Sequence, residues 1–470
     1  MTTDSNLQLR SGHRLEGGAH SERVGRNPGM ALGGAETDAA GGAQPKSERD
    51  WLMSQVVERT NMQLAYSRVM KNRGAPGVDG MRCEDLKAWL KANWTQMKQQ
   101  LLEGSYRPQA IRRVDIPKPQ GGVRMLGVPA VSDRLIQQAL HQVMQPLFEP
   151  TFSANSYGFR PGRSAKQAVS KAAEYTRSGK NWVVDMDIEK FFDRVNHDVV
   201  LARVARVLKD PKVLRLIRRF LEAGMMNNGV ETPRSEGTPQ GGPLSPLLSN
   251  ILLSDLDREL ETRKLSFCRY ADDANIYVSS ERSGRRIMDS VRRFLANRLK
   301  LTVNEAKSAV ARPWERKFLG YSVTANQGSK IRIAKTSIER LKESVRKLCM
   351  QGRGRALSRT IDGLNPILRG WMNYFSLSQS RRPIEELDAW VRRRLRCLVW
   401  RQWKQPKTRE SKMRGLGLDT QRAWKSSVNG RGPWWNAGAR HMIAAMPPRL
   451  FTQLGLVSLV ATHQHLQRSI

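Results

Sequence analysis

Three aspartates stand where they could carry out metal-dependent chemistry. Asp187 follows a short apolar run, and Asp272 and Asp273 are adjacent at the tip of a hairpin predicted over Ser266–Ser280. Adjacent carboxylates repel one another, and a divalent cation is the usual compensation. Three carboxylates around two Mg²⁺ ions is the arrangement that in-line phosphoryl transfer uses. An acidic pair by itself also fits an exposed loop, so the interpretation depends on its surroundings.

The elements expected around these aspartates alternate between strands and helices. Ile111–Ile116 and Val123–Val128 read as two strands joined by a turn, and helical spacing predicts a helix from near Asp50 and another over His197–Ala223. From about Thr336 onward the pattern is almost purely helical and very basic. Strands interleaved with helices, followed by a helical block, predict an α+β core with an all-α appendage.

The charge of the chain indicates a polyanionic partner. Lys and Arg number 80 against 43 Asp and Glu, a formal net charge of +37 over 470 residues. A phosphate backbone is the commonest partner of so basic a surface, because binding releases its counterions. The alternative is a merely soluble, highly charged protein. Charge alone says nothing about the reaction.

Several classes of protein are disfavoured by composition. The four cysteines are far apart and form no Cys-x-x-Cys pair, which argues against a zinc knuckle and a secreted disulfide scaffold. No apolar run approaches the roughly 20 residues that a membrane span needs, and the first residues do not resemble a signal peptide. We therefore expect a soluble, cytoplasmic protein with no membrane partner. Residues 1–48 are rich in Gly, Ala, Ser and charge, and we expect a disordered tail.

A series of motifs then resembles the reverse transcriptases encoded by bacterial group II introns. Tyr270-Ala271-Asp272-Asp273 resembles their YxDD box, and VVDMDIEKFFDRVNHD, with Asp187, resembles their first catalytic segment. The other motifs follow in family order: RGAPGVDGM (73–81), IPKPQGGVRMLGVPAVSDRLIQQAL (116–140), SYGFRPGRSA (156–165), GTPQGGPLSPLLSNILLSDLDREL (237–260), LTVNEAKS (301–308), FLGY (318–321), GWMNYF (370–375) and LDAWVRRRLRCLVWRQWK (387–404). The resemblance covers roughly residues 50 to 415.

This resemblance implies a right-hand polymerase. Fingers and palm are expected over 49–330, a helical thumb or maturase domain over 331–415, and a small basic C-terminal module over 416–470. The implied function is RNA-directed DNA synthesis, together with binding of the host intron RNA in splicing and mobility. The implied partners are the intron RNA, an RNA template with a DNA primer, target DNA and dNTPs. Two Mg²⁺ ions are the implied cofactor, held by Asp187, Asp272 and Asp273.

The resemblance also implies a nucleotide site. Lys118 and Arg124 flank the turn between the two predicted strands, where two cations could grip a triphosphate. Phe192 lies where the family places an aromatic ring beneath the sugar, so that the ring would clash with a 2′-hydroxyl, whereas Phe191 is expected in the core. Gln240 can hydrogen-bond the nucleotide or template, and the glycines after it allow close backbone approach.

The basic helical end is the candidate RNA contact. Between Ser380 and Gly415 there are 12 Lys and Arg against 4 Asp and Glu, a local net charge of +8. The tryptophans among them are expected in the core of the thumb. The arginines are expected to contact phosphate: Arg392, Arg393, Arg394 and Arg396.

Some alternatives stay open at this stage. Residues 429–470 contain no cysteine, and His463-x-His465 is read as incidental, so we expect no metal-bound endonuclease module, as in the class C lineage. A binding-only maturase without polymerase activity is one rival function. A domesticated reverse transcriptase of a defence or CRISPR system is another.

Overall fold

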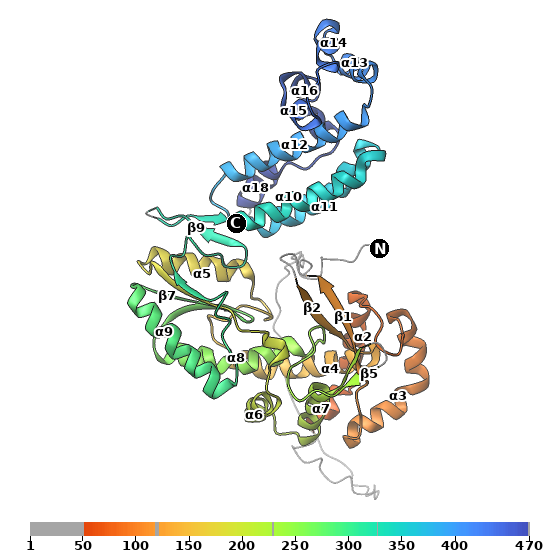
Figure 1. Cartoon of the computed structure of the whole chain (residues 1–470). Coiled ribbons are helices and arrows are strands. Elements are labelled where there is room, and N and C mark those ends of the chain that lie inside the picture. The colour runs from red at the N-terminus through yellow and green to blue at the C-terminus, as the bar shows by residue number, and fades with distance from the viewer. Residues whose placement is uncertain (1–50, 118–121, 228–229, 327, 469–470) are drawn as a thin grey trace, which may run out of the picture. The chain divides into compact units, whose positions relative to one another are not determined.

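The computed structural model of the chain describes residues 51–117, 122–227, 230–326 and 328–468 (Figure 1). The expected tail at 1–48, the start of the first helix at Asp50 and the side chain of Lys118 fall outside these ranges. Within them, helices and strands alternate up to β10 (Ile331–Ile333) and only helices follow. The predicted α+β core with a helical C-terminal region is therefore confirmed. None of the helices in these ranges is both long and apolar enough to cross a membrane.

The helix predicted from near Asp50 is two helices, α1 (Trp51–Val56) and α2 (Arg59–Asn72). Glu58 separates them, because its extended backbone and its carboxylate cap α2 by accepting from the N–H groups of Thr60 and Asn61. After a 3₁₀ turn at Cys83–Asp85, α3 spans Leu86–Glu103. α2 packs along α4 (Val131–Phe148), which is buried over most of its length.

The two predicted strands form a hairpin in a four-stranded sheet, which we call the fingers sheet. β1 (Ile111–Pro117) and β2 (Val123–Val128) pair antiparallel, with Ile116 opposite Arg124. β4 (Met225–Asn227) runs parallel to β1, and β5 (Val230–Thr232) completes the order β2-β1-β4-β5. The sheet thus joins a segment near residue 115 to one more than 100 residues later in the chain.

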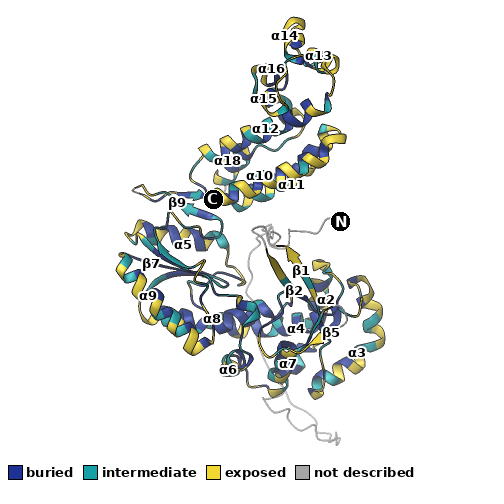
Figure 2. Cartoon of the chain, in the orientation of Figure 1, coloured by how far each residue is buried: buried dark blue, intermediate teal, exposed yellow. Residues whose placement is uncertain are grey.

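The palm sheet has the order β6-β7-β3-β8, with every neighbouring pair antiparallel. Both of its faces are buried, because helix α5 covers one face and helices α8 and α9 cover the other (Figures 1 and 2). Val183 and Val184 are consecutive on β3, yet Val183 packs into the core on the α5 side and Val184 into the core on the other side. The bounds are β3 Trp182–Met186, β6 Ser266–Tyr270, β7 Asp273–Val278, β8 Ala309–Ala311, α5 Ala165–Arg177, α8 Ser245–Thr262 and α9 Glu281–Phe294.

The helix predicted over His197–Ala223 is also divided. α6 (His197–Val207) and α7 (Pro211–Glu222) meet at Asp210, whose carboxylate caps α7 and also accepts from the N–H of Met53 in α1 at 2.9 Å. Proline at the first position of α7 cannot continue the preceding helix but suits a helix start. The break lets one buried aspartate tie two distant segments together.

The helical end is one packed body rather than a chain of separate helices. α12 packs against α10, α15 and α18, and α11 packs against α10 and α18, around a core that includes buried Trp400 and Trp403. Residues 416–468 therefore share the core of the thumb. The bounds are β9 Tyr321–Val323, α10 Lys335–Gln351, α11 Leu357–Tyr374, α12 Arg382–Gln402, α13 Pro406–Gly415, α14 Thr420–Ser427, α15 Pro433–Gly438, α16 Arg440–Ala445, α17 Pro448–Gln453 and α18 Leu459–Arg468.

Candidate active site

Strand register brings the three predicted catalytic aspartates to one end of the palm sheet. β6 and β7 are joined by the two-residue turn Ala271–Asp272. β3 lies beside β7 with Met186 opposite Ala274, so Asp187, one residue further along, comes opposite Asp273. Like charges at cross-strand positions are destabilising, so this end of the sheet needs compensating positive charge.

Asp185 belongs to the same acidic face. Side chains alternate along a strand, so Asp185 and Asp187 point to one side of β3, and the register places Asn275 and Asp273 beside them on β7. This is the face that α5 covers. Asp185 was missing from the residues predicted for the site. Its position two residues before Asp187 in VVDMD was the sequence signal that could have revealed it.

The turn that carries Asp272 has a strained backbone and a close neighbour. Ala271 has φ +58°, in the left-handed region that costs a non-glycine residue roughly 1–2 kcal/mol. Gly158, in the SYGF motif, lies against it, and a Cβ at Gly158 would stand 2.4 Å from the Ala271 nitrogen. Glycine at this position is therefore required by the approach of the SYGF loop to the aspartate turn.

Arg269 is buried directly beneath the turn and holds it to helix α8. Its guanidinium donates two bonds to Asp257, at 2.6 and 2.7 Å, and both side chains are 1% exposed. A third nitrogen donates to the Ala271 carbonyl at 2.8 Å and to Asn250 Oδ1 at 3.0 Å. Asn250 in turn donates to the Gly158 carbonyl at 2.8 Å. One buried cation thus ties the turn, α8 and the SYGF loop into a single network.

The carboxyl groups at the sheet end raise one another's pKa. Burial, followed by the charges of Asp185, Asp272 and Asp187, raises the pKa of Asp273 to about 8. Burial and the charge of Asp187 also raise the pKa of Asp272, whereas nearby Arg124 lowers it. Full ionisation of these carboxyl groups is therefore unfavourable in the metal-free protein, and a bound cation would favour it by lowering their pKa values.

Two cations from the segment after α9 partly balance this charge. Lys307 Nζ lies 3.2 Å from Asp187 Oδ2, and Ser308 Oγ accepts from the Asp187 N–H at 3.0 Å. Arg316 donates to Asp185 at 2.6 Å. Lys307 and Ser308 belong to the LTVNEAKS motif, so the motif pointed to this segment, although the sequence did not show which carboxylate each residue contacts.

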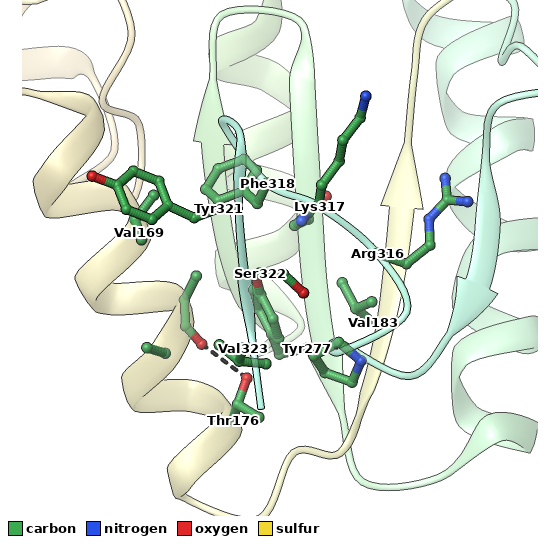
Figure 3. A pocket seen from close by; sticks show the side chains of 14 residues that line it. Val169, Thr176, Val183, Tyr277, Arg316, Lys317, Phe318, Tyr321, Ser322 and Val323 are labelled. Carbon is green, nitrogen blue, oxygen red and sulfur yellow. Dashed lines mark hydrogen bonds between the residues drawn. The ribbon is translucent and has the colours of Figure 1, made fainter. Parts of the chain in front are cut away.

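Figure 3 shows a small cavity on the α5 side of the same sheet, between α5, β3, β7 and the loop that leads into β9. Arg316, Lys317, Val183 and Tyr277 are among the residues that line it. Its volume of about 30 Å³ is enough for about one water molecule. It is too small for a nucleotide, and the aspartate end of the sheet remains the candidate site.

The donors at the sheet end suit a hard divalent cation in their chemistry. Carboxylate oxygens are the ligands that Mg²⁺ prefers, and the pKa of Asp273, which burial and then the neighbouring carboxylates raise, is one that a bound cation would lower. In the described ranges, however, no three His, Cys, Asp or Glu residues are arranged as a ready set of metal ligands. Asp187 pairs with Lys307 instead, so that an ion bound here would compete with the Lys307 ammonium.

Of the two predicted triphosphate cations, Arg124 lies in the described structure. It is exposed on β2 and close enough to Asp272 to lower the pKa of that carboxyl. Folding thus brings Arg124 to the aspartates from a segment about 150 residues away along the chain. Lys118 lies outside the described residues, and its role stays a prediction.

Phe192 and Gln240 lie on segments that meet between the palm and the fingers. Phe192 is half-buried on a 3₁₀ turn, edge-on to buried Phe191 at 5.2 Å between ring centroids, and its carbonyl accepts from the Thr238 N–H at 2.6 Å. The Gln240 carbonyl accepts from the Gly127 N–H of β2 at 3.1 Å. The prediction that Phe191 is a core residue is confirmed.

The glycines after Gln240 allow close backbone approach, as expected. Gly241 has φ +138°, and a Cβ there would stand 2.7 Å from the Gly127 carbonyl oxygen. A Cβ on Gly242 would stand 2.4 Å from the side chain of Gln137. In the structure these glycines approach the fingers strand and α4, so they are required for the loop to dock between palm and fingers.

The four predicted RNA-binding arginines of α12 have different environments. Arg396 is buried, donates to the Met446 carbonyl at 2.9 Å and lies over the Phe451 ring. It is a structural residue, and its assignment to phosphate contact is corrected, because its guanidinium is enclosed by α16 and α17. Arg393 stacks on Trp434, Arg392 lies 3.7 Å from Asp388, and Arg394 is half-buried.

Two regions of the chain match known protein families. Residues 116–323 match the family described as reverse transcriptase (RNA-dependent DNA polymerase). Residues 338–417 match the group II intron, maturase-specific domain. The first match contains the palm sheet and all three aspartates, and the second contains α12.

Curated relatives agree with these matches. The chain is 34% identical to Protein YkfC of Escherichia coli (strain K12) over 281 residues, 51% of this chain and 74% of that protein. It is 33% identical to the group II intron-encoded protein LtrA of Lactococcus lactis subsp. cremoris over 255 residues, 54% of this chain but only 41% of LtrA. A solved chain titled "Partial Cas6-RT-Cas1--Cas2 complex" aligns with a TM-score of 0.35 and 25% identity, over 52% of this chain and 42% of that chain.

Arg269→Met should destabilise the protein strongly. The substitution leaves Asp257 buried without a partner, which costs about 3–5 kcal/mol of unfolding free energy. Equilibrium urea unfolding measures the loss. Arg113→Met is the matched control, because Arg113 pairs with Asp115 at the surface and its loss should change the free energy of unfolding far less. Equal losses in the two variants would contradict the role assigned to Arg269.

The pKa of Asp273 predicts a pH-dependent difference between wild type and Asp273→Asn. The Asp273 carboxyl releases its proton near its ordinary value of 3.8 in the unfolded chain but only at about 8 in the folded chain. Ionisation therefore costs the wild type stability as pH rises across that interval. Without divalent metal, the melting temperature of Asp273→Asn should rise relative to wild type between these values and level off above them. A constant difference would show that Asp273 titrates normally.

Proposed function

The chain belongs to the reverse transcriptases that carry a group II intron maturase domain, and we propose that its Asp187, Asp272 and Asp273 catalyse template-directed DNA synthesis with bound divalent metal ions. The function is RNA-directed DNA synthesis, joined to binding of group II intron RNA in splicing and mobility. The observation that supports the site is the convergence of the three aspartates at one sheet end, where burial, together with the charges of the neighbouring carboxylates, raises the pKa of Asp273 to about 8.

Asp187, Asp272 and Asp273 would hold two Mg²⁺ ions. The chemistry that such ions supply when bound is activation of the primer 3′-hydroxyl and stabilisation of the leaving pyrophosphate. The remaining side chains position the carboxylates. Arg269 holds the turn from below, and Lys307 and Ser308 hold Asp187 from the side.

Residues on the fingers side receive the nucleotide. Arg124, whose charge lowers the pKa of Asp272, contacts the triphosphate, and Lys118, six residues before it in the sequence, is its partner. Phe192 lies under the sugar and excludes a 2′-hydroxyl, and Gln240 contacts the nucleotide or template from the docked loop. The substrate is therefore a dNTP paired to an RNA template.

The basic thumb supplies the RNA-binding role. Arg392 and Arg394 remain the proposed phosphate contacts of α12. The guanidinium of Arg393 instead stacks on the Trp434 ring and donates to the Trp434 carbonyl. The proposed partners are the intron RNA, a template–primer duplex and target DNA, in a cytoplasmic ribonucleoprotein. The maturase-specific match over residues 338–417, which includes these arginines, supports this assignment.

Asp272→Asn/Asp273→Asn is the primary test of the proposal. The measurement is dNTP incorporation on a primed RNA template with Mg²⁺, beside RNA affinity on the same preparation. Wild type should extend the primer, and the variant should lose about 1,000-fold in rate, because metal-bound charge stabilisation contributes several kcal/mol. RNA affinity should change little. A wild-type protein that binds RNA and makes no DNA would leave a binding-only maturase as the function.

Phe192→Ala should relax sugar selection. Removing the ring removes the clash with a 2′-hydroxyl, so the ratio of rNTP to dNTP incorporation efficiency should rise about tenfold or more, as an avoided clash of roughly 1.4 kcal/mol implies. Single-nucleotide incorporation kinetics measure the ratio. Phe191→Leu is the control, because Phe191 is buried and should change stability without changing the ratio. An unchanged ratio in Phe192→Ala would place the selectivity elsewhere.

A further inference from the structure

A broad groove lies on the fingers side of the chain, separate from the aspartate site. α2 and α3 line its two sides and Leu135 of α4 lies in its floor, and its volume is about 870 Å³. α2 packs along α4 instead of along α3, and the groove lies between α2 and α3. A volume of this size is within the range of ligand-binding clefts, roughly 300–1,000 Å³.

The floor of the groove is apolar and aromatic. Met62 is buried there, whereas Tyr66, Leu90 and Trp94 are only partly buried and line the open space. On α2 and α3 these residues recur at helical spacing, so each helix turns one apolar face to the groove. Large apolar side chains that gather in an open groove mark a binding surface.

The rim of the groove is positively charged. Arg59, Lys87, Lys91 and Lys98 line it, all four are exposed, and no carboxylate lines it. The described structure records no ion pair for these four side chains. The acids closest to them in sequence are engaged elsewhere. Glu58 caps α2, Asp85 accepts from the Arg82 N–H, and Glu103 accepts from Gln99.

The combination of an aromatic floor and a cationic rim identifies the ligand class. Aromatic side chains that stack bases and cations that follow the backbone are the parts of a single-strand nucleic-acid site. A duplex keeps its bases stacked internally, so only unpaired nucleotides could reach Tyr66 and Trp94. The net charge of +37 favours a polyanion over an apolar peptide for the same groove.

We propose that the α2–α3 groove is a second nucleic-acid site that binds unpaired RNA nucleotides, with bases stacked on Tyr66 and Trp94 and phosphates on Lys87, Lys91 and Lys98. On α3 the lysines at 87 and 91 are about 6 Å apart along the helix axis, and 91 and 98 about 10 Å. Trp94 lies between the latter two. The strand therefore runs along α3, where Lys91 and Lys98 lie on either side of Trp94 in the helix, and Tyr66 lines the groove from α2.

The test measures single-stranded RNA binding by the full-length chain while the polymerase site is occupied. The protein is first saturated with a template–primer duplex. A fluorescent oligouridine of about ten nucleotides, within the usual site size, is then titrated in. Tyr66→Ala/Trp94→Ala should weaken binding of this probe by about tenfold or more, since each stacked base contributes substantially. Trp94→Phe, which keeps a ring, should stay close to wild type, and binding of a duplex RNA of the same length should not change.

A second double variant and its control keep the proposal testable if Tyr66→Ala/Trp94→Ala fails to fold. Lys91→Ala/Lys98→Ala alters exposed side chains only, and should lower the slope of log affinity against log salt by about 0.7 per lysine for a single strand. Lys71→Ala, on α2 but outside the groove, is the matched control. Primer extension is recorded for every variant, so failure of the groove is distinguishable from failure of the polymerase proposal.

Three results would overturn the proposal. The first is oligouridine affinity that is unchanged in both variants. The second is an equal loss of single-stranded and duplex RNA binding, which would mean a general electrostatic effect. The third is a variant that shifts from dimer to monomer in sedimentation while RNA affinity is kept, which would make the groove an interface with a second copy of the chain.

Discussion

The buried contact between Arg269 and Asp257 is the interaction on which the acidic end of the palm sheet depends. A cation at 1% exposure is tolerated only with its partners in place, and here one guanidinium is satisfied by a carboxylate, a side-chain amide and the Ala271 carbonyl. The network fixes a turn whose own backbone is strained at Ala271. The backbone of Arg269 also donates to the Asn155 carbonyl and accepts from the Tyr157 N–H, so the side chain and the main chain of this residue together join the Asp272 turn to α8 and to the SYGF loop.

Charge is distributed unevenly in this molecule, and that distribution follows from the polymerase role. The chain as a whole carries +37, yet Asp185, Asp187, Asp272 and Asp273 gather at one sheet end. Lys307 and Arg316 pair with two of these carboxylates, and the charges of Arg124, Arg269 and Lys317 lower the pKa of one or more of the group. A basic surface attracts the nucleic acid, while the acidic centre is reserved for the cations that phosphoryl transfer needs.

Both backbone and side-chain groups make the long-range contacts that join distant segments of the chain. The loop around Gln240 docks on β2 through its carbonyl, and glycines at 241 and 242 make that approach possible. In the thumb, Asp388 caps the start of α18 by accepting from Leu459, which binds the C-terminal helix to α12. The C-terminal helices also cover Arg396, so this residue does not belong to the RNA-binding surface.

The sequence by itself determined the fold class, the strands of both hairpins, the three aspartates and the family, because these depend on local patterns and ordered motifs. The helix boundaries at Glu58 and Asp210 were not predicted from the sequence, because a capping carboxylate can end one helix and begin the next without changing the spacing of the apolar residues. Only the tertiary structure decided which side chains contact one another across the chain. Three contacts join segments that are about 50 to 120 residues apart: Asp185 lies near Asp273, Lys307 pairs with Asp187, and Arg396 is buried against the segment that contains Met446. The distances between such side chains are set by packing, which no local pattern encodes.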